Sequence, residues 1–335
     1  MQKRNFLLSS LALAVSCQVT SALAQKKYDP GASDTEIKIG QTMPYSGPAS
    51  AYGVIGKVQA GYFKMINEQG GVNGRKINFI SLDDGYSPPK TVEMVRRLIE
   101  QEEVLLLMNT LGTPPNTAIH RYVNSKKVPH LFLATGASKW NDPKRYPWTI
   151  GFNTNYHSEG MLYAKDILKN KPNAKIGVLV QNDDYGKDYL SGFKEGLGDK
   201  AKTMIVSEVT YEVTDPTIDS QIVTLKGSGA DTFFNITTPK FAAQAIRKVD
   251  DIGWKPTHYL NQVSASIGSV LKPAGIEKAV GVISMQYIKD PTEKRWENDA
   301  TMKEFFAFMK KYVPDASPED ANTTYGYAVA QLMVH

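Results

Sequence analysis

From Glu36 onward, short apolar runs alternate with segments whose apolar residues recur every three or four positions. Continuous apolar runs are typical of strands buried on both faces of a parallel sheet, and the longer spacing indicates amphipathic helices. Paired prolines open two of these helices and paired glycines end another, which sets their boundaries. In the first half of the chain we therefore expect strands at 37–39, 77–82, 104–108 and 130–134, and helices at 54–65, at 88–99 and from 114.

The same order of elements returns after residue 150. Two similar halves predict an α/β protein with two Rossmann-like lobes, each a parallel sheet between two layers of helices. The second half is expected to hold strands at 176–180, 204–209, 231–236 and 257–260, and helices at 185–198, at 239–252 and from Asp215, which would cap a helix with Pro216 in its first turn.

Segments beyond residue 280 have no place in a completed second lobe, so we expect the chain to return to the first lobe there. A strand at 282–285 and helices at 299–312 and from 323 are predicted in this part. Several crossings of this kind make a hinge with a cleft between the lobes, where small ligands usually bind. The expected domains are lobe 1 at 34–152 plus 283–335 and lobe 2 at 153–282.

The first 24 residues have the pattern of a secretory signal peptide. Lys3 and Arg4 precede an apolar run at 6–15, and small residues end the segment at Ala24. We expect cleavage after Ala24 and a periplasmic location. Lipid attachment at Cys17 is the less favoured alternative. Beyond this segment the sequence lacks a run of about 18 apolar residues, so no membrane insertion of the mature chain is expected.

Composition and charge narrow the classes of function. The chain has 335 residues, of which 41% are hydrophobic and 22% charged, and a formal net charge of +5 spread along its length. This dispersed charge does not predict a nucleic-acid partner. One cysteine and five scattered histidines do not match a disulfide framework or the common zinc patterns. We therefore expect no metal and no cofactor.

Motifs for catalysis are missing from the sequence. It holds no glycine-rich dinucleotide loop, no phosphate loop, no serine nucleophile elbow and no zinc-protease helix motif. His157 and Glu159 diverge at this spacing on a helix, so we interpret them as surface residues. Asp83 and Asp84 are interpreted as a solvated turn that caps the next helix, in preference to a cation site. The sequence predicts a protein that is not an enzyme.

The loops after the predicted strands instead carry hydroxyls, small residues and aromatic rings. Because each loop precedes a helix or a helix-like stretch, free backbone N–H groups and short hydroxyls can meet an anion there. Tyrosines add flat walls with a polar tip. The candidate ligand-binding residues in these loops, and the tyrosines that could wall the site, are Tyr45, Ser46, Tyr52, Gly112, Thr113, Ala134, Thr135, Gly136, Ala137, Tyr156, Tyr185 and Tyr287.

Several local motifs together resemble one known family. They are the strand at 36–40 with its Ser46-Gly47-Pro48 loop, the stretch 67–75, Asp83-Asp84 before Pro88, Val128-Pro129, and Asp184-Tyr185-Gly186. The sequence from about Glu36 to its end resembles the branched-chain amino acid type of periplasmic substrate-binding proteins. The resemblance implies a two-lobed type I fold that captures a small solute by hinge closure and delivers it to the transmembrane subunits of an ABC permease. It implies no catalysis.

The resemblance also implies roles for single residues. The aromatic beside the first loop falls on Tyr52, the third-loop hydroxyl on Thr113, the carboxylate site on 134–137 and the second-lobe tyrosine on Tyr185. Thr237 and Gln262 are expected to add second-lobe contacts on closure. A monomer is expected. Family members have a first-lobe disulfide that this sequence cannot form, and they continue for several elements, so C-terminal elements are expected to be missing after His335.

One departure from the family pattern points to the ligand. Amino-acid binders hold the ligand's ammonium with an acidic residue of the second lobe, but the corresponding stretch 259–265 is neutral here. A buried ammonium without a counter-charge is strongly disfavoured. We therefore expect a carboxylate without an α-amino group, an aromatic acid stacked between Tyr52 and Tyr185. Branched-chain or other amino acids, a ligand-sensing regulatory domain of the same fold and a secreted hydrolase remain alternatives.

Overall fold

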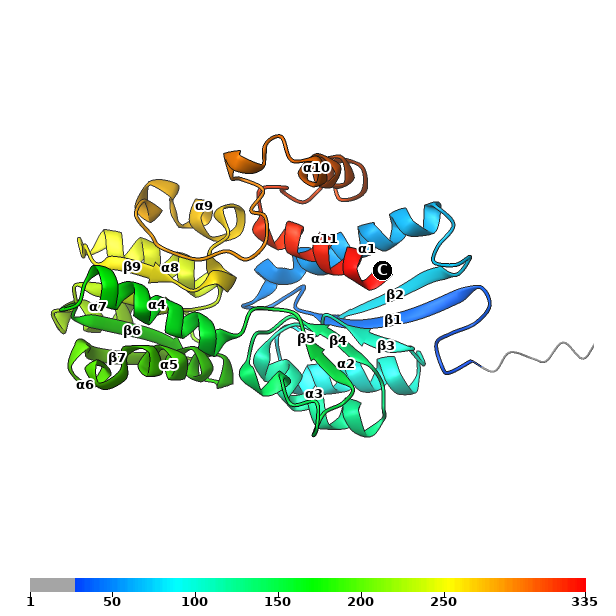
Figure 1. Ribbon diagram of the computed structural model, residues 1–335, viewed down its shortest axis with the longest axis horizontal. Helices are drawn as coiled ribbons and strands as arrows, with labels where there is room; N and C mark the ends of the chain where they lie inside the picture. The colour runs from blue at the N-terminus through cyan, green and yellow to red at the C-terminus, as the bar shows by residue number, and fades with distance from the viewer. Residues whose placement is uncertain (1–27) are drawn as a thin grey trace, which may run out of the picture.

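The computed structural model describes residues 28–335 as two lobes, each built on one parallel sheet (Figure 1). The expected signal peptide, its cleavage site after Ala24 and Cys17 lie outside the described residues. The first sheet has the strand order β2-β1-β3-β4-β5 and the second the order β7-β6-β8-β9. The strands are β1 (Glu36–Met43), β2 (Lys76–Asp83), β3 (Leu106–Met108), β4 (His130–Leu133), β5 (Thr149–Gly151), β6 (Ile176–Gln181), β7 (Ile205–Tyr211), β8 (Thr232–Ile236) and β9 (Thr257–Leu260).

Helices cover both faces of each sheet, which confirms the predicted α/β class. Buried residues of β6 alternate between the two faces, because Val178 and Val180 pack in the core under α4 and α5 whereas Leu179 packs under α7 and α8. In the first lobe, α1, α10 and α11 share one core and α2 and α3 the other. The helices are α1 (Gly53–Glu68), α2 (Pro88–Glu100), α3 (Thr113–Ser125), α4 (Tyr156–Asn170), α5 (Asp184–Leu197), α6 (Ala201–Met204), α7 (Asp219–Gly227), α8 (Pro239–Asp251), α9 (Lys272–Ala274), α10 (Ala300–Tyr312) and α11 (Ala321–Val334).

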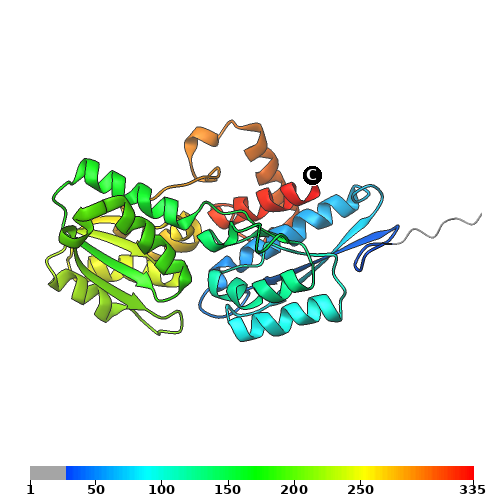
Figure 2. The ribbon, with the colours of Figure 1, turned by 60° about the horizontal axis from the view of Figure 1, so that its bottom comes forward.

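The chain passes between the lobes twice in the described residues. It enters the second lobe between β5 and α4, and it returns to the first lobe through the segment that precedes α10. There, α10 and α11 pack beside α1 (Figure 2). The last two helices therefore belong to the core of the first lobe although they follow the whole second lobe in sequence.

Two predicted elements were wrong. The segment 282–285 is not a strand: only Ile283 pairs with β9, through a single bridge to Tyr259, and its side chain is exposed, so it lacks a buried face. The helix expected from Asp215 begins four residues later, as α7. The carboxylate of Asp215 accepts the N–H of Glu212 and closes a turn instead of capping the helix.

Strand order fixes where a cleft can form. In the first sheet the chain runs from β1 outward to β2 and then back to β3 on the other side of β1, so the loops after β1 and β3 diverge. The second sheet repeats this arrangement with β7 and β8 around β6. Ligands bind at such switch points, beyond the carboxyl ends of the strands. The loops that leave these strand ends in both lobes line the space between the lobes.

Helices α4 and α5 approach each other so closely that only glycine fits at their crossing. A Cβ atom at Gly192 would lie 1.9 Å from the carbonyl oxygen of His157, and one at Gly160 would lie 2.3 Å from the carbonyl oxygen of Tyr189. Both obstacles are backbone atoms, so no side-chain rotation relieves them. Tyr156 and Tyr185, at the starts of the two helices, are thereby held at a fixed separation.

We predict that Gly192→Ala destabilises the protein by about 1–3 kcal/mol, because the two helices must move apart to admit the methyl group. The change is measured by denaturant unfolding. Gly227→Ala is the matched control, since nothing lies within 4 Å of the methyl group it adds at the end of α7. The control should stay within about 0.5 kcal/mol of the parent protein. Equal effects of the two substitutions would contradict the tight crossing.

Candidate ligand-binding site

A cleft between the two lobes is lined by side chains from both lobes and from the crossing segments. The space inside it, counted together with its open mouth and the gaps between its wall atoms, is about 670 Å³. Its lining residues are Tyr52, Ile55, Tyr86, Leu111, Gly112, Thr113, Ala134, Asn153, Tyr156, Tyr185, Thr238, Gln262, Val263, Ser266, Gln286, Tyr287, Ile288, Ala321, Asn322 and Tyr325.

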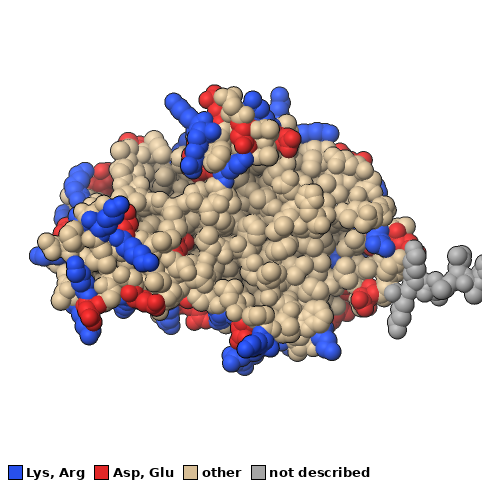
Figure 3. Space-filling model, in the orientation of Figure 1, with Lys and Arg blue, Asp and Glu red and all other residues tan. Residues whose placement is uncertain are grey.

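None of the residues that line the cleft in the described part of the chain carries a charge. The surface agrees with this: the middle of the face shown in Figure 3, where the lobes meet, is largely free of Lys, Arg, Asp and Glu. A ligand in this cleft would therefore meet hydroxyls, amides, backbone groups and rings.

The structure brings eight of the predicted site residues together around the cleft and places six elsewhere. Around the cleft are Tyr52, Gly112, Thr113, Ala134, Tyr156, Tyr185, Gln262 and Tyr287. Outside its lining are Tyr45, Ser46, Thr135, Gly136, Ala137 and Thr237.

The first loop turns Tyr45 and Ser46 toward β2 and away from the cleft. The Tyr45 hydroxyl is 2.6 Å from Ser81 Oγ, and the Ser46 hydroxyl donates to Asp83 Oδ2 at 2.6 Å. Asp83 also accepts the backbone N–H groups of Tyr45, Ser46 and Gly85. Partial burial acts to raise its pKa, but hydrogen bonds from the Ser46 hydroxyl, from the N–H groups of Gly85 and Ser46 and from Lys90 lower it to about 2. Its neighbour Asp84 is buried, and its side chain accepts from Tyr86 and Thr91, so the prediction of a solvated turn was wrong for Asp84.

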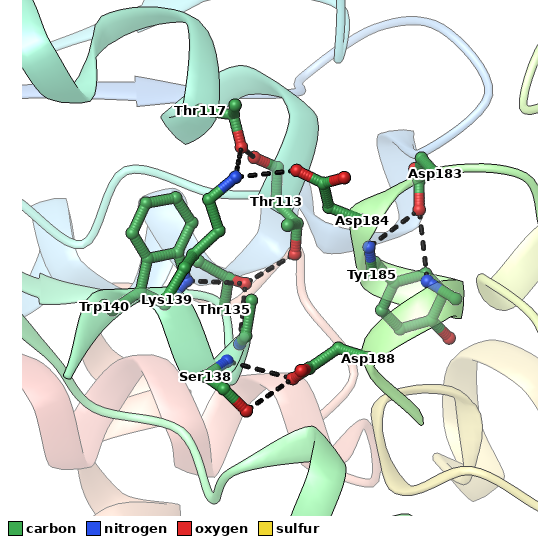
Figure 4. Close-up of polar contacts among 12 residues, drawn as sticks. Thr113, Thr117, Thr135, Ser138, Lys139, Trp140, Asp183, Asp184, Tyr185 and Asp188 are labelled. Atoms are coloured by element: carbon green, nitrogen blue, oxygen red, sulfur yellow. Dashed lines mark hydrogen bonds and ion pairs between the residues drawn. The ribbon is translucent and has the colours of Figure 1, made fainter. Parts of the chain in front are cut away.

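Two threonine hydroxyls meet at the first-lobe side of the cleft. Thr113 Oγ1 and Thr135 Oγ1 are 2.6 Å apart, and the indole N–H of Trp140 donates to Thr135 Oγ1 at 3.2 Å (Figure 4). The Trp140 proton occupies an acceptor position of this pair. The two hydroxyls carry two protons, and their mutual hydrogen bond uses one of them. The second proton remains for another acceptor, and Thr113 is the member of the pair that lines the cleft.

Fewer backbone N–H groups are free here than the loops suggested. Pro114 and Pro115 have no N–H and occupy the first turn of α3. The N–H of Ala134 donates to Thr110, and that of Ala137 to Thr135 Oγ1. The hydroxyl pair offers a proton on this side that these engaged amides do not.

Tyrosine rings form much of the cleft wall. The ring of Tyr156 stands edge-on to that of Tyr185, with 5.3 Å between the centroids, and stacks on that of Tyr189 at 4.5 Å. Burial raises the pKa of the Tyr156 and Tyr185 hydroxyls far above the ordinary range, so both stay protonated. The Tyr185 hydroxyl is engaged: it donates to the carbonyl oxygen of Thr237 and accepts from the Asn261 amide.

Hydrogen bonds join the lobes on either side of the cleft. The Tyr52 hydroxyl of the first lobe donates to the carbonyl oxygen of Val263 of the second lobe at 3.1 Å. Near α5, the N–H and the hydroxyl of Ser138 both donate to Asp188, and Lys139 forms a 2.6 Å ion pair with Asp184 (Figure 4). The lobes are thus in contact, with the cleft enclosed between them.

Glu159 corrects a sequence interpretation. It was expected at the surface, but only 1% of it is exposed. Its Oε1 atom accepts the N–H of Gln262 at 2.9 Å and its Oε2 atom accepts the Tyr189 hydroxyl at 2.7 Å. Burial is the main cause that raises its pKa, to about 7. His157 lies nearer the surface and is 3.1 Å from Glu195.

Sequence reasoning missed the cleft residues contributed by distant segments. Asn153 and Gln286 come from the crossings, and Asn322 and Tyr325 come from α11. The Tyr325 hydroxyl donates to Asn153 at 2.8 Å, so α11 and the first crossing meet at the cleft. Tyr287 was predicted, and its buried hydroxyl has no hydrogen-bond partner among the described residues. For Tyr325, in the apolar helix α11 near the end of the chain, the sequence gave no signal that could have placed it at the cleft.

Two parallel sheets joined by crossing segments, with an uncharged cleft at their switch points, define a two-lobed solute-binding protein. Residues 36–335 match the sequence profile of the periplasmic binding protein family, and the chain belongs to that family. A curated relative, "Leu/Ile/Val-binding protein homolog 1" of Brucella suis, is 24% identical over 315 residues, which cover 90% of this chain and 78% of the relative.

Solved structures with the same fold include proteins named for different ligands. A fatty acid ABC transporter substrate-binding protein from Thermomonospora curvata has a TM-score of 0.78 at 24% identity and covers 92% of this chain and 77% of its own. A solute-binding protein of an ABC transporter from R. palustris, in complex with benzoate, has a TM-score of 0.75 at 20% identity and coverage of 89% and 79%. A branched-chain amino acid transporter substrate binding protein from Streptococcus pneumoniae, in complex with isoleucine, has a TM-score of 0.73 at 20% identity and coverage of 90% and 83%.

Residues 28–335 lack the features of two other kinds of site. No helix between residues 28 and 335 is both long and apolar enough to span a bilayer. The same part of the chain contains no group of three or more His, Cys, Asp or Glu side chains placed to hold a metal ion.

We predict that Tyr52→Phe shifts the lobes toward a more open arrangement, because it removes a hydrogen bond that exists only when the lobes touch. One such bond contributes about 1 kcal/mol, which is about a fivefold change in the ratio of closed to open molecules. The shift is measured as the distance distribution between labels on cysteines introduced at the exposed residues Lys64 and Lys202. Tyr62→Phe, within the first lobe, is the control. An unchanged distribution in Tyr52→Phe would show that this bond does not favour closure.

Proposed function

We propose that this protein captures a small carboxylate with an apolar, aromatic body outside the cytoplasm and delivers it to the transmembrane subunits of an ABC permease. The supporting observation is the uncharged cleft, which pairs tyrosine walls with a hydroxyl proton at Thr113 and Thr135. Rings bury well between rings, and hydroxyls hydrogen-bond a carboxylate without an opposing ion. The protein acts as a binder and catalyses no reaction.

The absence of an acidic side chain from the described lining supports a ligand without an ammonium group. An ammonium buried here would lack a counter-charge, which is strongly unfavourable. Glu159 is a second-lobe carboxylate behind the cleft wall, but both of its oxygens already accept hydrogen bonds from the protein and its side chain is buried.

The ligands named for the structural relatives share one chemical group. Benzoate, fatty acids and isoleucine all carry a carboxylate, and the first two lack an α-amino group. An aromatic acid fits the tyrosine walls of this cleft better than a long acyl chain does. Amino-acid binding is the second candidate, favoured by the curated Leu/Ile/Val-binding relative.

Capture follows from closure. A ligand held at Thr113 on the first lobe gains contacts with Tyr185 and Gln262 of the second lobe only when the lobes meet. A ligand shifts the population toward the closed form by its differential affinity for that form. A shift of a few kcal/mol suffices if the closed form is rare in the free protein. The permease would then recognise the paired lobes of the closed form.

A thermal-shift panel with benzoate, octanoate and isoleucine tests the ligand class. We expect benzoate to raise the melting temperature most, because binding to the folded state stabilises it by mass action. An increase with isoleucine alone would overturn the aromatic-acid proposal and leave a solute-binding role. Turnover of any of these compounds would overturn the assignment as a binder.

We predict that Thr113→Val weakens benzoate binding by about tenfold, because the cleft loses the hydroxyl that meets the carboxylate. Thr135→Val should weaken it less, since Thr135 acts through Thr113 and does not line the cleft. Calorimetry of both variants checks the order, with unfolding curves of the free proteins recorded beside it. Equal affinity of Thr113→Val and the parent protein would refute the position of the carboxylate.

A further inference from the structure

The carboxylate of Glu159 lies directly behind the second-lobe wall of the cleft. Its Oε1 atom accepts the N–H of Gln262 at 2.9 Å, and the Gln262 side chain lines the cleft. The next residue, Val263, lines the cleft too and receives the Tyr52 hydroxyl from the other lobe. One residue therefore separates this buried carboxylate from both the ligand space and the contact between the lobes.

No cation balances Glu159 within the part of the chain that the structure describes. The groups that face its carboxylate are the N–H of Gln262 from the turn after β9, the Tyr189 hydroxyl from α5 and the Tyr163 hydroxyl from its own helix α4. Tyr156, one turn earlier, and Tyr287, on the second crossing, sense its charge. Burial keeps the pKa of all four tyrosines well above the ordinary range, so each stays neutral.

Three other carboxylates near the cleft are also supplied with hydrogen-bond donors by the protein. Asp183 accepts two backbone N–H groups and the Gln181 amide. Asp320 accepts from Ser266, Ser269 and both nitrogens of Asn322. Asp84 accepts the N–H of Tyr86 and the hydroxyl of Thr91. Burial raises the pKa of each of the three, and it raises that of Glu159 to about 7, so the charge of Glu159 changes near neutral pH.

We propose that Glu159 is a positioning residue for the cleft wall and that its carboxylate takes up a proton when the cleft binds a carboxylate ligand. The proposal rests on the proposed function, because it needs an anionic ligand. A ligand anion enters an uncharged cleft that offers no cation to screen it from Glu159. Two like charges about 10 Å apart at an effective dielectric constant of about 20 alter a binding constant by on the order of tenfold. Protonation of Glu159 removes this repulsion and leaves the hydrogen bond to Gln262 in place.

The protonation of Glu159 balances in atoms and in charge. One proton passes from solvent to an oxygen of Glu159, no other covalent bond changes, and the charge of the closed complex equals that of the ligand-free protein with Glu159 ionised. Either Tyr189 or Tyr163 can accept the new O–H through its phenolic oxygen. The ligand is therefore bound more tightly below neutral pH than above it.

Calorimetric titration with benzoate from pH 5.5 to 8.5, in two buffers of different ionisation enthalpy, measures both the dissociation constant and the protons taken up. We expect the dissociation constant to rise about tenfold across this range and a net uptake of part of one proton per benzoate near pH 7. Glu159→Gln keeps the shape and an acceptor for Gln262 but cannot titrate, so its affinity should be independent of pH with no uptake from this site.

His157→Gln is the matched control, because His157 lies two residues away on the same helix and its side chain contacts Glu195 instead of Gln262. This variant should keep the pH dependence of the parent protein. Tyr189→Phe is a second variant. It removes a donor that favours the ionised carboxylate, so the midpoint of the pH dependence should move upward.

The outcomes separate this proposal from the proposed function. Benzoate binding with no proton uptake, or with equal uptake in Glu159→Gln, would overturn the role of Glu159 and leave the ligand class intact. No benzoate binding at any pH would overturn the ligand class and this proposal together.

The free energy of unfolding, measured in the absence of ligand, gives an independent test. Because the pKa of Glu159 rises on folding, the parent protein should lose stability relative to Glu159→Gln as the pH rises from 4.5 through 7. Parallel stability curves would also overturn the proposal.

Discussion

A buried charge needs a partner, and this requirement shapes the whole cleft. Moving an ion from water into a protein interior costs several kcal/mol unless hydrogen bonds or a counter-ion replace the lost water. The cleft meets this constraint by presenting no charge of its own: its polar groups are hydroxyls and amides, and the nearby carboxylates are turned into the protein and supplied with donors. The inference that the ligand lacks an ammonium group follows from this neutrality.

The strands and most helices could be predicted because their residues report on local surroundings. Val178 to Val180 are apolar without interruption because β6 is covered on both faces, and Pro88 and Pro239 mark helix starts through their missing N–H groups. The loops at the cleft could be located for the same reason, since strand ends determine them. Where the start of a helix depended on competing turns, as at Asp215, the local pattern misled.

The rest of the candidate site depends on contacts between distant parts of the chain. Glu159 is buried by Tyr189 and Gln262, which lie 30 and 103 positions away in sequence. Tyr325 reaches the cleft only because α11 returns to the first lobe and meets Asn153 across 172 positions. A single sequence shows neither approach. It shows a glutamate near a helix start, which is more common at a surface, and a tyrosine in an apolar helix, which is more common in a core.

The backbone contact between α4 and α5 has a further consequence for how solutes of different size are received. Because Gly160 and Gly192 leave no free space at the crossing, the rings of Tyr156 and Tyr185, which touch edge to face, form a fixed wall of the second lobe. A larger ligand cannot push this wall back, so the lobes must rotate less far toward each other when they close over it. The size of the ligand then determines how far the two lobes close, and the degree of closure changes the outer surface of the protein.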